Sequence, residues 1–188
     1  MTIPANAALV LIDVQKGMDD PRWGQRNNRD AERHMARLLA AWREARRPVV
    51  HVQHLSREPD SPLRPERSGS ALKAETAPRD DEPVFQKQVN SAFIGTELER
   101  HLREREIEHL VMVGLTTDHC VSTTARMASN LGFAVTVVAD ATATFDRVSF
   151  DGARFTAEQM HRLALASLHS EFATVRLSDD VLSAIGAS

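Results

Sequence analysis

Three reactive side chains follow apolar runs in this 188-residue chain. Asp13 and Lys87 each close such a run, and Cys120, the single cysteine, lies in the turn after another. A cysteine attacks a carbonyl carbon as its thiolate, which is the minor form at neutral pH because the usual pKa is about 8.5. A carboxylate accepts the thiol proton and returns it to a leaving group, while an ammonium or a helix N-terminus stabilises the thiolate. The three residue types therefore make up a base, a cation and a nucleophile.

Each of these residues also has a purely structural interpretation. An aspartate at the end of a strand often caps a turn, a lysine there is usually a solvated charge, and a lone cysteine is most often a small buried hydrophobe. One cysteine forms neither an internal disulfide nor a Cys-x-x-Cys redox or zinc site. A redox-sensor function for Cys120 would lack a resolving cysteine. The position of the three residues in the fold must decide between these interpretations.

The elements that would position them are short strands separated by helices. Apolar runs predict six strands, the last two more weakly, over residues 8–13, 48–54, 109–115, 134–140, 83–87 and 172–177. The hydrophobicity of these runs is continuous rather than alternating, which is typical of strands covered on both faces, as in parallel sheets.

Helical patterns lie between the predicted strands. One begins near Asp30, a short one includes Leu98 and Leu102, and one follows Cys120 and stops at Gly132. The last helix is predicted to open with a capping box. Its capping residues are Thr156 and Gln159, and its apolar face is expected to comprise Met160, Leu163, Ala164 and Leu168.

Alternation of strands and helices predicts an α/β protein, a Rossmann-like three-layer α/β/α sandwich with a mainly parallel, six-stranded sheet. We expect a single domain over residues 1–188. Ligands of such sheets bind beyond the carboxyl ends of the strands, which brings Asp13, Lys87 and Cys120 to one edge. The segment 55–83, rich in proline, serine and charge, is predicted to be a long functional loop, either a lid or an oligomer contact.

Composition excludes several classes of partner. The net charge is −3 and acidic and basic residues are mixed, so neither nucleic acid nor a membrane surface is an expected partner. The N-terminal stretch has no signal-peptide pattern, and no apolar run approaches the roughly 18 residues that span a bilayer. We expect a cytoplasmic protein that acts on a small molecule.

Four segments of the chain resemble the isochorismatase-like cysteine hydrolases, a superfamily that includes N-carbamoylsarcosine amidase and nicotinamidase. They occur in the order and spacing of that family and read LVLIDVQKGM, FQKQVNSAFIGTEL, VMVGLTTDHCVSTTARMASNLGF and VVADATAT. The resemblance implies that Asp13 is the general base, Lys87 its charged partner and Cys120 the nucleophile. It also implies a cis peptide bond between Leu115 and Thr116, and an oxyanion hole formed by the backbone N–H groups of Thr116 and Cys120.

The chain departs from nicotinamidases at their metal site. Those enzymes hold a metal through an Asp-x-His pair after the second strand and a histidine in the following loop. Here His54 and Ser56 stand at the positions of the pair, and the loop 55–83 has no histidine. We therefore predict no metal and no cofactor. His51 and His54 remain alternative ligands, but residues three apart in a strand lie on opposite faces, which favours ordinary strand or pocket residues.

Aromatic residues near the predicted edge are candidates for the substrate pocket. We expect Trp23, Phe93, His119 and Phe145 to bind substrate, with packed surface-loop or turn residues as the alternative interpretation. Arg22 or Arg26 would meet an anionic group. Gln15 is expected to hold Asp13 by a hydrogen bond, and His161 is expected to be structural.

The function predicted is that of a metal-independent cysteine hydrolase, which cleaves a C–N bond of a small amide or ureido compound through a thioester. True isochorismatases cleave a vinyl ether and typically lack this cysteine, so the presence of Cys120 favours C–N cleavage. Two alternatives stay open. One is hydrolysis of an ester, a lactam or a vinyl ether at the same site, and the other is a catalytically silent binding or assembly protein. The resemblance also implies a homo-oligomer, a dimer or a tetramer.

Overall fold

The computed structural model describes residues 3–186 of the chain. Its centre is a six-stranded sheet with the strand order β3-β2-β1-β4-β5-β8, in which all neighbouring strands are parallel. The strands are β1 (Ala8–Ile12), β2 (Val49–His54), β3 (Val84–Lys87), β4 (His109–Leu115), β5 (Ala134–Ala143) and β8 (Thr174–Arg176). All six predicted strands are present, and the predicted mainly parallel α/β sandwich is confirmed.

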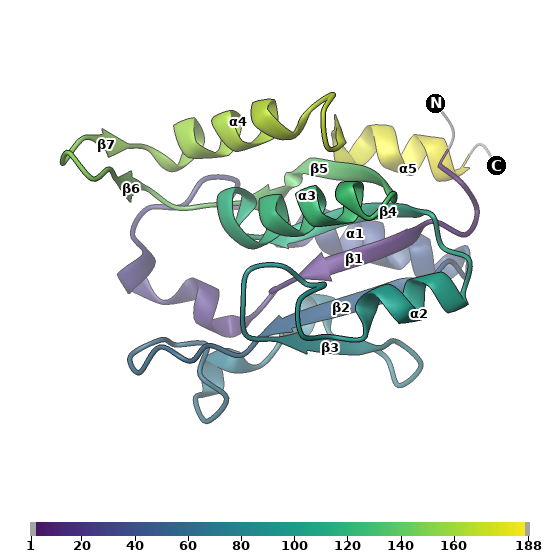
Figure 1. Cartoon of the computed structure of the whole chain (residues 1–188), viewed down its shortest axis with the longest axis horizontal. Coiled ribbons are helices and arrows are strands. Elements are labelled where there is room, and N and C mark those ends of the chain that lie inside the picture. The colour runs from purple at the N-terminus through teal and green to yellow at the C-terminus, as the bar shows by residue number, and fades with distance from the viewer. Residues whose placement is uncertain (1–2, 187–188) are drawn as a thin grey trace.

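Helices cover both faces of this sheet (Figure 1). They are α1 (Ala31–Glu44), α2 (Leu98–Glu104), α3 (Ser122–Asn130), α4 (Ala157–Leu168) and α5 (Ser178–Gly186). Buried side chains of α1 and α5 pack in one apolar cluster with Leu9 and Leu11 of β1. Buried side chains of α2, α3 and α4 pack in a second cluster with Val10 and Ile12. Successive residues of β1 thus enter opposite layers, which explains why the apolar runs are continuous.

The helix boundaries follow local signals in the sequence. The predicted capping box of α4 is present, with the Thr156 side chain accepting from the backbone of Gln159 and the Gln159 side chain accepting from the backbone of Thr156. Gly132 has φ +87°, a left-handed conformation that ends α3 without the steric penalty that a side chain would add. Asp30 stands at the N-cap of α1, but its side chain makes no capping hydrogen bond.

Two expectations about the C-terminal part are corrected. The predicted apolar face of α4 is wrong in part, because Leu163 is 60% exposed whereas Ala157, His161 and Leu168 are buried. Met160 and Ala164 are half-buried, so the inner face is the predicted one without Leu163 and with the polar His161 added. Helix α5, which has no counterpart among the predicted elements, closes the layer beside α1.

Irregular segments gather at the carboxyl end of the strands. They contain the short helices η1 (Lys16–Asp19), η2 (Pro21–Trp23), η3 (Ser68–Ser70) and η4 (Ala74–Thr76), the turn η5 (Thr117–Val121), and the hairpin of β6 (Arg147–Val148) and β7 (Arg154–Phe155). The long loop 55–83 carries η3 and η4 and packs against η1. Across residues 3–186, no helix is both long and apolar enough to cross a membrane.

Candidate active site

The three predicted catalytic residues lie at one end of the sheet. Asp13 directly follows β1, Lys87 is the last residue of β3, and Cys120 lies in η5 between β4 and α3. Because the strands are parallel and ordered β3-β2-β1-β4, their carboxyl ends carry these side chains to the same edge. The side chains of Asp13 and Lys87 are fully buried, and Cys120 is 8% exposed.

The ammonium of Lys87 joins the site together. Its Nζ lies 2.6 Å from Oδ2 of Asp13 and 3.3 Å from Sγ of Cys120. A third contact, of 3.0 Å, joins it to Nδ1 of His54. An ammonium has three N–H donors. Each donor of the buried Lys87 therefore has an acceptor, which is the condition under which a protein interior tolerates such a charge.

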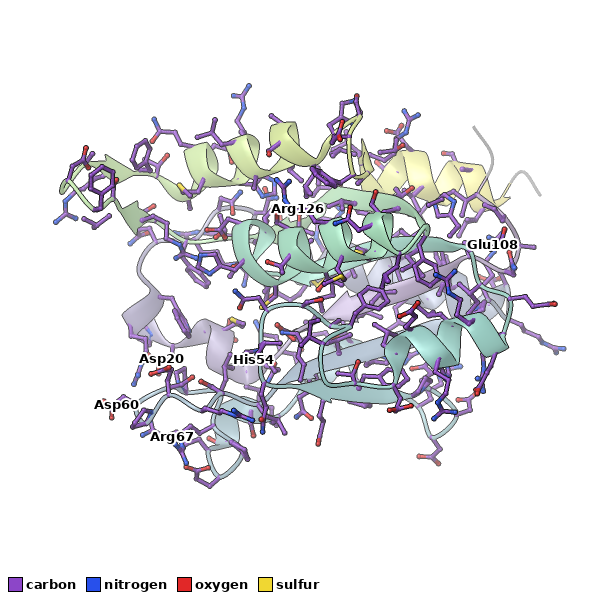
Figure 2. All side chains as sticks on the ribbon, in the orientation of Figure 1. Asp20, His54, Asp60, Arg67, Glu108 and Arg126 are labelled. Atoms are coloured by element: carbon purple, nitrogen blue, oxygen red, sulfur yellow. The ribbon has the colours of Figure 1, made fainter. Side chains whose placement is uncertain are left out.

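His54 is the member of this cluster whose contact with the lysine was not predicted. It closes β2, next to β3 in the sheet, and Figure 2 shows it where the strands meet the long loop. Burial, together with the positive charge of Lys87, lowers the pKa of His54 below its ordinary value, so the ring is neutral at neutral pH. A neutral ring accepts the Lys87 N–H at Nδ1. The strand-end argument that selected Asp13 and Lys87 applies equally to His54.

The thiol of Cys120 holds its proton in the resting site. Burial raises its pKa, the negative charge of Asp13 raises it further, and the charge of Lys87 only partly opposes them. The charge of Lys87 favours the thiolate, as expected, but burial and Asp13 outweigh it. The thiol needs an acceptor for its proton at the moment of attack.

Asp13 has an oxygen available as that acceptor. Oδ2 accepts from Lys87, whereas Oδ1 is buried and has no hydrogen-bond partner within the described part of the chain. One donor atom each of Asp13, His54 and Cys120 lies within 4.8 Å of the others. The thiol also donates a weak hydrogen bond of 3.7 Å to Oδ1 of Asn90, which lines the cavity. The carboxylate is thus placed to take a proton from sulfur.

Asp13, His54 and Cys120 are also residue types that ligate metals. Within residues 3–186, these three side chains form a cluster whose ligand atoms lie close enough together to hold a metal ion. Nζ of Lys87 contacts one atom of each of the three, so its positive charge occupies the place that a cation would take. His51 does not join them, because its Nε2 lies 3.0 Å from a carboxylate oxygen of Glu82. The pairing of His51 and His54 as ligands is therefore wrong.

The turn that carries Cys120 has the expected backbone. The peptide bond between Leu115 and Thr116 is cis. Gly114 precedes it with φ +127°, and a Cβ at that position would lie 2.0 Å from the carbonyl oxygen of Ile12. A residue with a side chain would separate β4 from β1, so glycine allows the close contact that brings Thr116 and Cys120 beside Asp13.

Buried polar contacts also tie this turn to neighbouring segments. Oγ1 of Thr117 lies 2.9 Å from Nδ1 of His161, the residue expected to be structural, on α4. Burial alone would raise the pKa of Asp118, but the hydrogen bond from Thr144 and the charges of His119 and Arg147 hold it below its ordinary value. The ionised Asp118 thereby links η5 to the segment that leads into β6.

A cavity of about 590 Å³ opens above Cys120. Its lining comprises Asp13, Met18, Arg22, Trp23, His54, Ser56, Glu58, Pro59, Asp60, Ser61, Pro62, Leu63, Asn90, Thr116, His119, Cys120 and Arg147. Residues 56–63 belong to the long loop, which therefore forms a wall of the cavity, while its function as a lid or an oligomer contact stays a prediction. Asn90, Arg147 and most of these loop residues were not predicted, because no sequence pattern indicates which way a loop side chain points.

The four predicted pocket residues divide into two pairs. Trp23 and His119 line the cavity. Phe145 lies outside the lining but stacks on Trp23, with ring centroids 6.0 Å apart. Phe93 is buried in the apolar cluster beneath the sheet, where it stacks on Phe133. Phe145 therefore supports a wall of the cavity, and Phe93 contributes to the core.

Three further expectations concern polar residues. Arg22 lines the cavity, whereas Arg26 donates to Glu32 at 2.7 Å and lies outside the lining. The side chain of Gln15 bonds to the backbone of His54 and Ser70 rather than to the carboxylate of Asp13. The predicted support of Asp13 by Gln15 is therefore wrong, and Gln15 instead ties β2 to the long loop.

Comparison with known proteins identifies the family. The family model of the isochorismatase domain matches residues 7–180. An uncharacterized isochorismatase family protein of Bacillus subtilis is 45% identical over 175 residues, which cover 93% of this chain and 94% of that protein. A crystal structure from Chromobacterium violaceum assigned to the same family superposes with a TM-score of 0.96 at 44% identity, covering 100% of this chain and 98% of that one.

A relative with a named reaction is more distant. The ureidoacrylate amidohydrolase of Variovorax paradoxus is 28% identical over 173 residues, which cover 73% of this chain and 69% of that enzyme.

Proposed function

The chain belongs to the isochorismatase family of hydrolases, and from that premise we propose that it is a metal-independent cysteine amidohydrolase. It cleaves the C–N bond of a small amide or ureido compound and passes through a thioester. One observation carries this proposal: a buried ammonium, that of Lys87, contacts both the carboxylate of Asp13 and the sulfur of Cys120 at the base of a cavity. The amidohydrolase of Variovorax paradoxus supports the reaction type.

The first step forms the thioester. As Sγ of Cys120 attacks the carbonyl carbon, its proton passes to Asp13, because the resting thiol is protonated and Oδ1 of that carboxylate has no other partner. The carbonyl oxygen becomes an anion, which the backbone N–H groups of Thr116 and Cys120 stabilise. Lys87 remains bonded to Asp13 and keeps it in place while its charge changes.

The intermediate then collapses. The C–N bond breaks, the leaving nitrogen takes the proton from Asp13, and ammonia or an amine departs. A water molecule attacks the thioester and gives a proton to Asp13 as it does so. When the C–S bond breaks, the sulfur of Cys120 regains that proton, and a carboxylic or carbamic acid leaves the site.

Two variants of Cys120 test this function. Cys120→Ala and Cys120→Ser should release ammonia or amine from a panel of small amides at less than about one thousandth of the rate of the unchanged protein, because the nucleophile is lost. Mass spectrometry of the unchanged protein during turnover should show an acyl group on Cys120. Full turnover by both variants would remove Cys120 as the nucleophile, and turnover of esters without any release of nitrogen would favour the alternative hydrolase.

A further inference from the structure

We propose that Asp118 is a positioning residue for the oxyanion hole, and that it holds Thr116 and Cys120 in place by tying their turn to the segment that follows β5. The inference rests on the proposed function, in which the backbone N–H groups of these two residues stabilise the developing anion. It adds a residue that serves the reaction without touching the substrate. Three observations carry it: the place of Asp118 in the turn, the partners of its carboxylate, and its position outside the cavity lining.

Asp118 lies midway between the two proposed oxyanion donors. It belongs to η5, two residues after Thr116 and two residues before Cys120. Its side chain is only 7% exposed, and the neighbouring Thr117 is fully buried. A carboxylate in such a place costs free energy unless hydrogen bonds and an opposite charge compensate it, so its partners show what it does.

Four side chains from two segments surround the carboxylate of Asp118. Within the turn, Nε2 of His119 lies 3.6 Å from Oδ2. From the segment that follows β5, Oγ1 of Thr144 donates to Oδ1, and Nε of Arg147 lies 3.1 Å from Oδ2. Although burial raises the pKa of Asp118, hydrogen bonds from the side chains of Thr144 and Thr116 help to hold it below its ordinary value. The ionised carboxylate therefore binds the turn to the following segment through both of its oxygens.

The segment that anchors Asp118 is itself held in place. The backbone N–H of Thr144 donates to Oδ1 of Asn27 at 2.8 Å, and the carbonyl of Thr144 accepts from the backbone N–H of Asn27 at 3.2 Å. The backbone N–H of Asp146 donates to the carbonyl of Gln25 at 2.9 Å. Figure 1 shows this segment leaving β5 toward the hairpin of β6 and β7. Because its backbone is bonded to a second segment, it gives the carboxylate a fixed attachment.

Asp118 lies outside the cavity lining, whereas the residues around it line the cavity. Thr116, His119, Cys120 and Arg147 all belong to the lining. A molecule in the cavity therefore meets the turn and the guanidinium of Arg147 but not the carboxylate that holds them. Loss of this carboxylate would release the turn from its attachment and leave Arg147 without its acidic partner.

A displaced turn should slow the reaction more than it weakens binding. Preorganised donors stabilise an oxyanion only when they point at the position that the oxygen will take, and a misplacement of about 1 Å costs on the order of 100-fold in rate. Asp118→Ala should therefore lower kcat roughly 10- to 100-fold for the amide that the unchanged protein cleaves fastest. KM should change less than about threefold, because no lining side chain is removed. Asp118→Asn keeps an acceptor for Thr144 without the charge, so its kcat should lie between the two.

Asp140 provides a matched control on β5. Its carboxylate accepts from the backbone N–H and from Oγ of Ser178, both at 2.7 Å, and it lies outside the cavity lining. Both Asp118→Ala and Asp140→Ala should lower the melting temperature, because each removes the acceptor of partly buried hydrogen bonds. Asp140→Ala should leave kcat per folded molecule unchanged. Equal losses of kcat in the two variants would show that Asp118 only supports the fold, and the inference would be wrong.

The thioester on Cys120 gives a direct readout of the oxyanion hole. In Asp118→Ala, the infrared stretch of the thioester carbonyl should move to higher frequency, because misplaced N–H donors polarise the carbonyl less. A purely structural function of Asp118 would lower the amount of the adduct without moving this frequency. Either an unchanged frequency or a kcat within about threefold of that of the unchanged protein would overturn the inference.

Addition of an aldehyde keeps this inference separate from the proposed reaction. Sγ of Cys120 adds to the carbonyl carbon of acetaldehyde and the thiol proton ends on the carbonyl oxygen, so a hemithioacetal forms with no C–N bond to break. Its dissociation constant, measured by NMR with carbon-13-labelled acetaldehyde, should rise roughly tenfold in Asp118→Ala and stay unchanged in Asp140→Ala. If no amide releases nitrogen but this difference appears, the proposed function fails and the positioning by Asp118 stands. Equal affinities of Asp118→Ala and the unchanged protein, or no adduct with either, would overturn the inference.

Discussion

Replacement of His54 by leucine should impair catalysis while leaving the cavity in place. In the structure, Nδ1 of His54 is 3.0 Å from the Nζ of Lys87 and accepts one of its three N–H groups. The other two acceptors are Asp13 and Cys120, which take part in the proposed reaction. Leucine has a similar volume and no acceptor, so His54→Leu leaves one N–H of a fully buried ammonium unpaired.

The magnitude follows from the loss of that hydrogen bond. A hydrogen bond to a charged group contributes about 1.5–3 kcal/mol. Since about 1.4 kcal/mol corresponds to a tenfold change in rate, kcat should fall roughly 10- to 150-fold if the whole effect appears in the transition state. KM should change much less, because His54 is one lining residue of a cavity whose other walls keep their side chains.

The assay compares two variants across pH. His54→Asn retains an oxygen close to the position of Nδ1, so it should recover most of the kcat that His54→Leu loses. The pKa of His54 lies below its ordinary value of 6.5, so in the unchanged protein the ring gains a proton, and loses its acceptor, only at acidic pH. That acidic decline in kcat should disappear in both variants, because neither has a titrating group at residue 54.

Two results would refute this reasoning. If His54→Leu folds with unchanged stability and keeps kcat within about threefold of the unchanged protein, Lys87 does not depend on that acceptor. If His54→Asn is as slow as His54→Leu, the ring matters for its shape and not for its lone pair. A purely structural function would also leave the acidic decline in place, whereas the proposed contact removes it.

Four shorter predictions concern other parts of the molecule. Because burial and Asp13 raise the pKa of Cys120, iodoacetamide should alkylate this thiol slowly at pH 7 and faster above pH 9. Rapid alkylation at pH 6–7 would contradict a protonated resting thiol. Gly69→Ala should destabilise the protein by about 1–3 kcal/mol through the clash with the loop, whereas Gly186→Ala, with nothing near the added Cβ, should leave the melting temperature nearly unchanged. Burial raises the pKa of Glu82, but hydrogen bonds from Arg43 outweigh it and lower the pKa from 4.5 to about 2. The contribution of Glu82 to the free energy of unfolding is therefore complete above pH 4.5 and should be lost as the pH falls toward 2. Denaturant titrations at several pH values measure this loss. We propose a homo-oligomer, a dimer or a tetramer, because Phe150 is fully exposed on a two-stranded hairpin that would be marginally stable alone. Light scattering should give a mass above the 20.9 kDa of one chain, and Phe150→Ser should lower it. A monomeric mass for the unchanged protein would refute this proposal.

The catalytic edge was predictable because two simple regularities coincide in it. Continuous apolar runs indicate buried parallel strands, and parallel strands end at a common edge where ligands bind. The place of Asp13, Lys87 and Cys120 at this edge follows from these regularities, whereas their catalytic roles are what the family resemblance implies. The same argument extends to His54, which ends β2, but a histidine at a strand end has so many ordinary explanations that its contact with Lys87 needed coordinates.

The walls of the cavity were not predictable, for a physical reason. The direction of a loop side chain depends on backbone contacts between segments far apart in sequence, such as the approach of Gly69 to Pro62. No periodicity encodes such contacts. Phe93 illustrates the limit, because its place after the lysine motif suggested the pocket, yet its ring packs on Phe133 in the core. Helix α4 shows a related limit, since its buried face is centred on His161, which a hydrophobicity pattern does not select.

A protonated resting thiol is compatible with hydrolysis of an amide and does not weaken the case for Cys120 as nucleophile. An amine is a poor leaving group and must receive a proton as the C–N bond breaks. In the proposed reaction, burial keeps the proton on sulfur until attack, Asp13 then takes it at the unpaired Oδ1, and the same proton reaches the leaving nitrogen. The neutral His54 fits this scheme, because it supports the Lys87 ammonium without competing for that proton.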